Sequence, residues 1–217
     1  MPNYATQRLN MVDTQVRTND VTDPRIHEAM VDVPRERFVP ATKRALAYAD
    51  VPVEISPHRF LLDPRSFAKL LTLADVRPGD RVLDVGCATG YSAAVLARLG
   101  KSVTALEQDA DLVRVASDML TAVGATNATV VQGSLIDGFK RNAPYEVIFV
   151  DGAIEAPPET LLGQLAEGGR LVAVVLGSSG ARAHVFLREK GRIGSRADFD
   201  ADVPVLVGFR KTVGFVF

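Results

Sequence analysis

The sequence predicts an α/β fold with a doubly wound, mostly parallel sheet, preceded by an N-terminal helical extension. From residue 80 onward, short apolar runs typical of strands alternate with segments whose apolar residues recur at helical spacing. The strand-like runs are apolar at nearly every position, which indicates burial on both faces, as in parallel sheets. The first of these runs also ends in a glycine-containing turn that opens a helix, an arrangement typical of doubly wound folds.

The first fifty residues are predicted to be mainly helical. Two apolar stripes at helical spacing support this prediction, namely Leu9, Val12 and Val16, and then Ile26, Met30 and Val33. Pro24 is expected to start the second of these helices. Residues 48–63 are expected to be irregular because they contain two prolines. Asp63 is then suited to cap a helix with Pro64 at its first position, since an aspartate side chain accepts hydrogen bonds from free N–H groups there.

The rest of the chain is predicted to supply the sheet and its connecting helices. The apolar runs assigned as strands are residues 81–85, 102–107, 128–132, 147–151, 170–176 and 183–188. The connecting helices are expected at about 90–99, 112–123 and 157–169. Gly124 is expected to stop the second of them. Two further apolar runs, 204–209 and 212–217, have no helix between them and predict an antiparallel edge of the sheet.

Composition argues against several classes of protein. Of the 217 residues, 25 are Lys or Arg and 26 are Asp or Glu, and a formal charge of −1 gives no support to a nucleic-acid partner. The single cysteine, Cys87, excludes an intramolecular disulfide, and the 3 histidines form no ligand pair, so no metal site is expected. No apolar run approaches the length of a membrane span, and the N-terminus lacks the apolar segment of a signal peptide. We therefore expect a cytoplasmic protein without membrane contact.

The most informative segment is the turn after the first predicted strand, Asp84-Val85-Gly86-Cys87-Ala88-Thr89-Gly90. Glycines at such a turn let the backbone approach a ligand closely, and the following helix offers free N–H groups. The second strand ends at Glu107, where a carboxylate can accept hydrogen bonds from both ribose hydroxyls of an adenosine. Taken singly, the glycines are explained by a tight turn and Glu107 by a solvated acid. Together they favour a nucleoside-containing cofactor.

Two details narrow the choice of cofactor. A dinucleotide site would have glycines two and five positions after Gly86, whereas this chain has Ala88 and Tyr91 there, so NAD and FAD are disfavoured. No Walker lysine or Ser/Thr follows Gly90, which disfavours a nucleoside triphosphate.

At these residues the chain resembles the class I S-adenosylmethionine-dependent methyltransferases. In that class an acidic-x-Gly-x-x-x-Gly loop holds the methionine portion of the cofactor and an acid ending the second strand holds the ribose. The resemblance implies a seven-stranded Rossmann-like sheet and S-adenosyl-L-methionine as the cofactor. It implies cofactor contacts for Asp84, Gly86, Cys87, Ala88, Gly90, Glu107, Gln108, Ser134, Leu135 and Asp151. We hypothesise that oxidation of Cys87 would block the cofactor.

Over nearly its whole length the chain further resembles the protein-L-isoaspartate O-methyltransferase family. The most distinctive match is Val33-Pro34-Arg35-Glu36-Arg37-Phe38-Val39-Pro40, and the helix after the glycine turn is similar as well. That family methylates the α-carboxylate of isoaspartyl residues in damaged proteins and so starts their repair. The resemblance implies a protein or peptide substrate. A general base is unnecessary, because a carboxylate is already nucleophilic at pH 7 and mainly has to be held in line with the methyl group.

The predicted substrate site departs from this family. Aligned on Pro64, the family's Gln-Thr-Ile-Ser-x-Pro string reads Arg59-Phe60-Leu61-Leu62-Asp63-Pro64, so both hydroxyl side chains are lost. The family's Gly-Asp-Gly after the third strand reads Gly133-Ser134-Leu135, and its Thr-Ala-Ala after the fourth reads Asp151-Gly152-Ala153. The candidate catalytic residues of this altered site are Asp151, Leu62 and Phe60.

The roles of these residues stay open at this point. An acid at the end of a buried strand, as Asp151 is, can take a proton from a hydroxyl substrate or bind a cation, but it can equally bond backbone N–H groups. Phe60 and Leu62 are expected mainly to pack locally. Arg59 can pair with a substrate carboxylate, but an exposed loop arginine is the simpler interpretation.

Three functions therefore compete. The first is methyl transfer to an isoaspartyl carboxylate, and the second is transfer to a small molecule or another protein group with Asp151 as base. The third is a catalytically silent family member that binds the cofactor. Residues 1–63 are predicted to form the helical extension and substrate-side loop, and residues 64–217 the cofactor-binding domain. The run 213–217 is interpreted either as an edge strand or as a homodimer contact.

Overall fold

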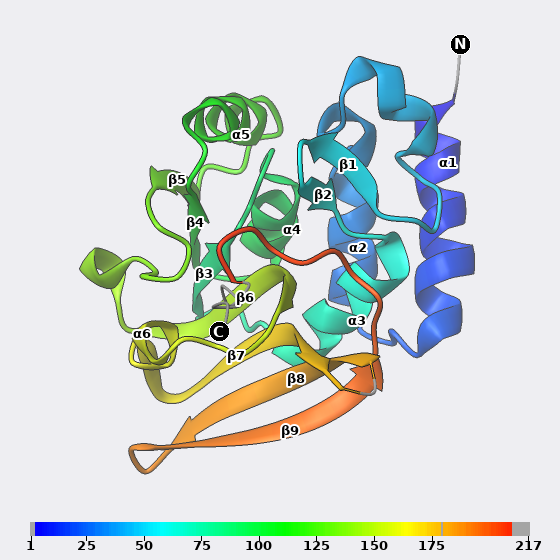
Figure 1. Cartoon of the computed structure of the whole chain (residues 1–217). Coiled ribbons are helices and arrows are strands. Elements are labelled where there is room, and N and C mark those ends of the chain that lie inside the picture. The colour runs from blue at the N-terminus through cyan, green and yellow to red at the C-terminus, as the bar shows by residue number, and fades with distance from the viewer. Residues whose placement is uncertain (1–2, 179, 210–217) are drawn as a thin grey trace, which may run out of the picture.

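The computed structural model describes residues 3–178 and 180–209. Its centre is a seven-stranded sheet with the order β5-β4-β3-β6-β7-β8-β9 (Figure 1). The strands are β3 (Arg81–Val85), β4 (Ser102–Glu107), β5 (Ala128–Gln132), β6 (Tyr145–Ile154), β7 (Leu165–Gly177), β8 (Gly180–Glu189) and β9 (Arg192–Asp200). The pairs from β5 to β7 are parallel, and β8 and β9 add antiparallel strands. The predicted mostly parallel α/β fold is therefore confirmed.

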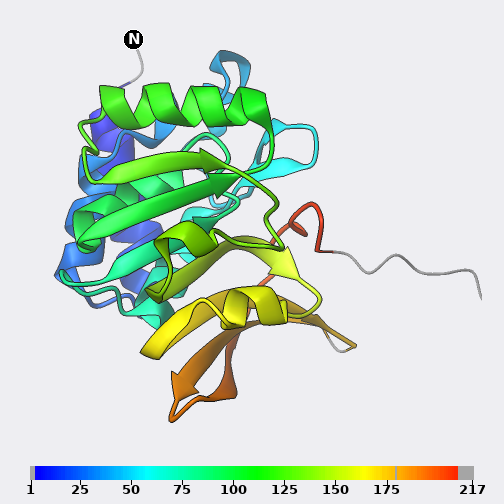
Figure 2. The same ribbon diagram turned by 90° about the vertical axis from the view of Figure 1, so that its left-hand side faces the viewer.

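Helices and a small hairpin surround this sheet. The helices are α1 (Tyr4–Met11), α2 (Pro24–Asp32), α3 (Pro64–Ala74), α4 (Tyr91–Leu99), α5 (Ala110–Ala122) and α6 (Glu159–Leu162). Helices α1, α2 and α3 gather at one side of the molecule, and α5 runs alongside the β4–β5 edge (Figures 1 and 2). Between α2 and α3, the antiparallel strands β1 (Val53–Ser56) and β2 (Arg59–Leu61) form the hairpin.

Alternate residues of the central strands enter two separate hydrophobic cores, because successive side chains of a strand point to opposite faces of the sheet. Val82 of β3 and Phe149 of β6 belong to the larger core, which also contains residues of α2, α3, α4 and α5. Leu83 and Ile148 belong to the smaller core on the other face. That smaller core is completed by α6 and by Leu206, from the segment after β9. Burial of both faces explains the nearly continuous apolar strands.

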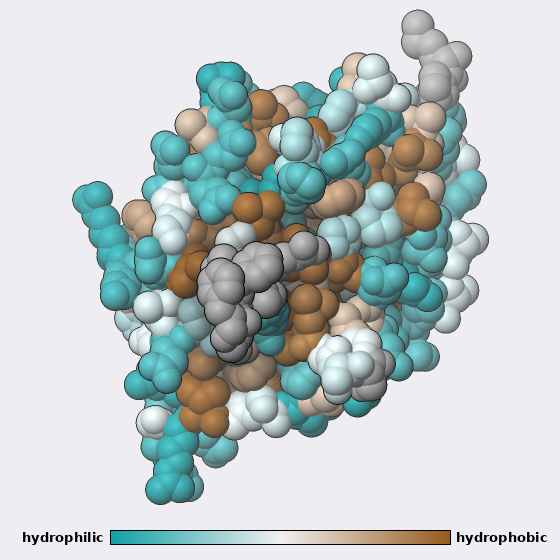
Figure 3. All heavy atoms as spheres, in the orientation of Figure 1, coloured by the Kyte–Doolittle hydropathy of each residue, from teal (hydrophilic) through white to brown (hydrophobic). Residues whose placement is uncertain are grey.

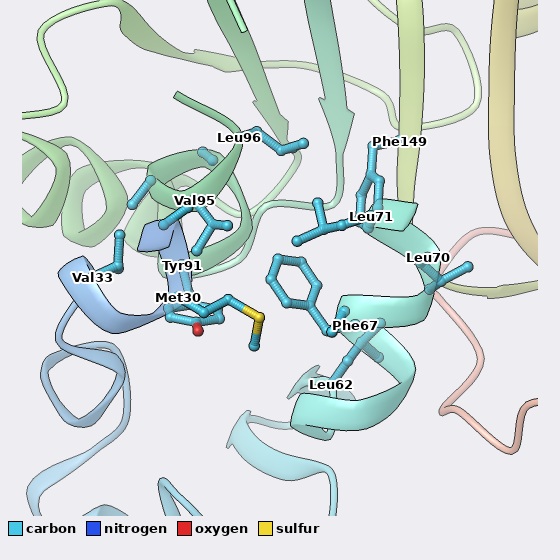
Figure 4. Packing of buried hydrophobic residues seen from close by; sticks show 14 of the residues in the cluster. Met30, Val33, Leu62, Phe67, Leu70, Leu71, Tyr91, Val95, Leu96 and Phe149 are labelled. Atoms are coloured by element: carbon cyan, nitrogen blue, oxygen red, sulfur yellow. The ribbon is translucent and has the colours of Figure 1, made fainter. Parts of the chain in front are cut away.

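Helix α3 joins the N-terminal extension to the sheet. As predicted, Asp63 caps it, since its side chain accepts a hydrogen bond from the N–H of Ser66 at 2.8 Å, and a proline fills the first helical position. Figure 4 shows Phe67 of α3 directed toward the other elements of the core. Its ring centroid lies 5.4 Å from that of Tyr91 and 5.8 Å from that of Phe149. The larger core is therefore continuous across the boundary between residues 63 and 64 that the sequence suggested.

Two predictions for the extension were wrong. Leu9 does not share the buried stripe of Val12 and Val16, and 49% of it is exposed. The reason is that α1 passes into a π-helix at Val12–Val16, whose wider turn breaks the helical spacing. The stretch from 48 to 63 is not irregular throughout but contains the β1–β2 hairpin, and its prolines precede β1 or lie in the turn.

Two predictions for the second half also need correction. The helix expected over 157–169 is reduced to α6, because β7 begins at Leu165 and includes the glycine pair. The antiparallel edge is made by β8 and β9, whereas residues 204–209 cross the carboxyl ends of the parallel strands (Figure 1). Val205 forms a parallel bridge with Ala153 there. The runs 212–217 and 213–217 lie outside the described residues.

Among residues 3–178 and 180–209, no helix combines the length and apolar character needed to cross a membrane. The same residues contain no group of three or more His, Cys, Asp or Glu side chains placed to hold a metal ion.

Loss of the Asp63 cap should weaken the link between the extension and the sheet. We expect Asp63→Ala to lower the free energy of unfolding by about 1 kcal/mol, because an N–H at the start of α3 loses its acceptor. Asp118→Ala is the control, since Asp118 is exposed on α5 and should change stability by less than about 0.5 kcal/mol. Urea unfolding of both variants measures this, and equal effects would contradict the capping role.

Candidate functional site

The glycine turn and the candidate acids meet at one edge of the sheet, where the parallel strands β3, β4 and β6 end. Strand β3 leads directly into the turn at 86–90, Glu107 is the last residue of β4, and Asp151 lies in the second half of β6. Because β3 has β4 and β6 as its neighbours, these residues lie side by side. The carboxyl edge is the usual position of a ligand site in an open parallel sheet.

Glu107 is fully buried, and its carboxylate is saturated with hydrogen-bond donors. Its Oε1 accepts from the main-chain N–H groups of Gln108 at 2.8 Å and Asp109 at 3.1 Å, and its Oε2 from that of Ala88 at 2.9 Å. The Arg59 guanidinium adds a bidentate pair, Nη1 to Oε1 and Nη2 to Oε2, at 2.5 Å each. Since a carboxylate offers about four acceptor positions, none is left for the hydroxyls of a ribose.

The β1–β2 hairpin places Arg59 at this carboxylate. His58 takes the left-handed conformation at φ 60°, and Arg59 begins β2 directly after it. The Nη2 of Arg59 also donates to the carbonyl oxygen of Gly86 at 3.0 Å, which ties the hairpin to the glycine turn. Only 5% of Arg59 is exposed. The interpretation of Arg59 as an exposed loop residue was therefore wrong, because Glu107 supplies the charge that lets a guanidinium be buried.

Asp84 and Asp151 form a second pair of buried acids beside this ion pair. The Oδ2 of Asp84 accepts a hydrogen bond from the hydroxyl of Ser92 at 2.7 Å. In the part of the chain that the structure describes, the Oδ1 atoms of Asp84 and Asp151 have no hydrogen-bond partner. A buried carboxylate oxygen without a hydrogen-bond donor is costly when the group is charged, so both carboxyls favour the protonated form.

Burial sets the pKa values of both acids. The pKa of Asp84 is held well above its ordinary value, first by burial and then by the nearby charge of Asp151. Burial raises the pKa of Asp151 to about 7, against the lowering effects of the Ser92 hydroxyl and of Arg59 and Arg35. The site therefore contains an acid that titrates near neutral pH.

The segment after β9 covers the glycine turn. Its Leu206 N–H donates to the carbonyl oxygen of Ala153 at 2.8 Å, and the Ala153 N–H donates to that of Pro204 at 2.9 Å. A Cβ built on Gly86 would lie 2.8 Å from the Cδ1 of Leu206, and one on Gly152 would lie 3.0 Å from its Cβ. The whole turn from 86 to 90 is buried. Figure 3 shows hydrophobic residues gathered at the centre of the face that carries this segment.

The space left between the hairpin and this segment is small. It is a cavity of about 10 Å³ lined by residues that include Arg59, Phe60, Leu62, Asp151 and Leu206. Such a volume holds at most a single water molecule, whereas sites for drug-sized ligands and cofactors occupy roughly 300–1,000 Å³. The conformation described therefore does not fit a nucleoside cofactor, although Asp84, the glycine turn, Glu107 and Asp151 lie together at this edge.

The remaining candidate site residues differ in burial and in the core to which they belong. Leu62 is 2% exposed and belongs to the larger core, where Figure 4 shows it near Phe67. Ser134 is exposed at the end of β5, and Leu135 is buried in the smaller core. Cys87 is buried, and burial together with the charge of Asp84 raises the pKa of its thiol, which disfavours the reactive thiolate.

Comparison with known proteins places this chain in a family. The model of the protein-L-isoaspartate(D-aspartate) O-methyltransferase (PCMT) family matches residues 6–198. The chain belongs to this family. The resemblance inferred from the sequence motifs is thereby confirmed over most of the chain.

Relatives in the PCMT family are similar in sequence to this chain along most of its length. The chain is 39% identical over 191 residues to a protein-L-isoaspartate O-methyltransferase of Koribacter versatilis, a match that covers 88% of this chain and 86% of the relative. It is also 39% identical over 206 residues to the protein of the same name from Methylorubrum populi, covering 93% and 95% of the two chains.

Solved structures of the family share the fold. One protein-L-isoaspartate O-methyltransferase superposes with a TM-score of 0.80 at 24% identity, covering 94% of this chain and 66% of that chain. A putative PCMT from Plasmodium falciparum in complex with S-adenosyl-L-homocysteine gives a TM-score of 0.80 at 21% identity, covering 92% and 97%.

Sequence reasoning missed two residues of the site, Arg59 as a partner of Glu107 and Leu206 as the cover of Gly86. The signal for Arg59 was present, since a charged residue replaces the neutral glutamine of the family string. For Leu206 no local signal exists, because its position depends on how the chain returns after β9.

Ionisation of Asp151 should make the stability depend on pH. Its pKa is about 7 when folded but 3.8 when unperturbed, so the folded chain keeps a proton that the unfolded chain releases. Stability is therefore lost as the pH rises from about 4 to about 7. We expect Asp151→Asn to be more stable than the wild type at pH 8, by roughly 2–4 kcal/mol, with the difference vanishing toward pH 4.

Urea unfolding across this pH range tests the expectation. Asp118→Asn on the exposed face of α5 is the matched control and should differ from the wild type by a constant amount. A difference for Asp151→Asn that does not change with pH would contradict the raised pKa.

Proposed function

We propose that this chain is an S-adenosylmethionine-dependent O-methyltransferase whose acceptor is the α-carboxylate of isoaspartyl residues in damaged proteins. The observation that carries the proposal is the PCMT family match over residues 6–198. Two features of the site support it, namely the turn from Gly86 to Gly90 and Glu107, which share the carboxyl edge of β3 and β4. The name of the Koribacter versatilis relative supports the same acceptor.

Methyl transfer to a carboxylate requires the protein mainly to position the acceptor against the methyl group. The cofactor would supply an electrophilic methyl group, and an acceptor carboxylate is already ionised at neutral pH, so no base is required. A second negative charge beside the acceptor would be unfavourable. The raised pKa of Asp151 meets this condition, since the acid is largely neutral below pH 7.

A second acceptor class is favoured by one specific observation. Asp151 combines burial with a pKa of about 7, and a general base works best when its pKa lies near the operating pH. Phe60 and Leu62 also stand where the family string has hydroxyl side chains. A hydroxyl acceptor deprotonated by Asp151 is therefore the alternative substrate.

The two acceptors predict opposite effects of pH and of one substitution. With an isoaspartyl peptide, we expect methyl transfer that declines above pH 7 as Asp151 becomes charged, and Asp151→Asn should retain activity within about tenfold. With a hydroxyl acceptor, the rate should rise through pH 7, and Asp151→Asn should lose 10²-fold or more.

The measurement is transfer of labelled methyl from S-adenosylmethionine to an isoaspartyl peptide and to its aspartyl twin. Methylation of the isoaspartyl peptide alone supports the proposal. The proposal fails if neither peptide is methylated by protein that binds S-adenosylhomocysteine in the same sample.

A further inference from the structure

We propose that Arg59 is an intramolecular competitor of the cofactor: its guanidinium occupies the Glu107 carboxylate, and Leu206 closes the adjoining glycine turn. The inference deepens the proposed function and rests on it, since it takes the carboxyl edge of the sheet to be the cofactor site. It adds that the chain holds this site closed and that a nucleoside ligand binds only when Arg59 leaves.

Arg59 occupies acceptor atoms of Glu107 that the hydroxyls of a ribose would need. Both oxygens are already bonded, to Arg59 on one side and to the N–H groups of Ala88, Gln108 and Asp109 on the other. The main-chain donors are fixed by the turn and by the start of α5. Arg59 is the partner carried on a side chain, so it is the one that a ribose can replace.

The side chains of Arg59 and Leu206 meet at Gly86. A Cβ on Gly86 would lie 2.8 Å from the Cδ1 of Leu206 and 3.5 Å from the Nη2 of Arg59. Arg59 comes from the β1–β2 hairpin and Leu206 from the chain after β9, so segments far apart in sequence close on the same glycine. A ligand that approaches the Gly86 backbone must displace both side chains.

Polar contacts hold both Arg59 and Leu206 over the glycine turn. Leu206 is anchored by the paired main-chain hydrogen bonds of Pro204 and Leu206 with Ala153. Arg59 is held by its ion pair with Glu107 and by the Gly86 carbonyl oxygen, in surroundings that exclude water. Charge-assisted bidentate bonds of this kind are among the strongest polar contacts in proteins. The observed ligand affinity then equals the affinity of the open form multiplied by the fraction of molecules that are open.

The experiment measures binding of S-adenosylhomocysteine to the full chain by isothermal titration calorimetry. Arg59→Gln introduces the neutral residue of the family string and frees Glu107, so we expect it to bind at least tenfold more tightly than the wild type. Leu206→Ala leaves the ion pair intact, and we expect it to bind severalfold more tightly. Arg170→Gln is the matched control, because it breaks a partly buried ion pair with Asp80 that lies at the opposite ends of the strands, and its affinity should equal that of the wild type.

The outcomes separate this inference from the proposed function. The inference is overturned if Arg59→Gln binds no more tightly than the wild type, or more weakly. If Arg59→Gln does not fold, Leu206→Ala decides, and an unchanged affinity for it overturns the inference. If the isoaspartyl peptide is methylated but neither variant binds S-adenosylhomocysteine more tightly than the wild type, the proposed function is supported and the inference is overturned. A gain in binding without methyl transfer by any of these proteins would support the inference and remove the proposed function.

Discussion

The ion pair between Arg59 and Glu107 is the interaction on which the rest of the site depends. Three acids, Asp84, Glu107 and Asp151, are buried at one edge of the sheet, and Arg59 is the cation that contacts one of them directly. The charge of Glu107 raises the pKa of both aspartates, whereas that of Arg59 lowers it. The guanidinium thus offsets the repulsion that would otherwise accompany three carboxyl groups in a space from which water is excluded.

A second buried arginine explains why the most distinctive sequence string matters for the same site. Arg35 is fully buried, and its guanidinium lies 4.8 Å from the ring centroid of Tyr91, at the start of the helix after the glycine turn. It donates to the carbonyl oxygens of Ala47 and Leu62. The string from Val33 to Pro40 therefore acts through Arg35, which fixes the chain on either side of the β1–β2 hairpin and so constrains where Arg59 can reach.

The sheet and the base of the site could be predicted because their signals are local. Burial on both faces left the central strands nearly continuously apolar. Asp84 and Glu107 lie near the carboxyl ends of their strands, and Gly86 follows β3 directly. The positions of Arg59 and Leu206 over the glycine turn could not be predicted, because they depend on contacts between distant parts of the chain. Arg59 is buried only because Glu107 faces it, and Leu206 lies on Gly86 only because the chain after β9 turns back across the sheet. Leu9 was misplaced for a different reason, since a π-helix changes the period that the apolar pattern assumes.

Two of the three departures from the family pattern, Arg59 to Leu62 and Asp151, share a location, and this argues that they belong together. Arg59 replaces a glutamine of the family string, and Phe60 and Leu62 replace its two hydroxyl residues. All three lie in the hairpin or directly after it and line the small cavity together with Asp151. The residues that form the base of the site, from Asp84 to Gly90 and Glu107, keep the cofactor-binding pattern. An apolar cover excludes water, and exclusion of water strengthens the Arg59–Glu107 pair beneath it. Each change therefore makes the others more favourable, so the hairpin, Leu206 and the ion pair act as one closing unit over the glycine turn and Glu107, the residues that we propose bind the cofactor.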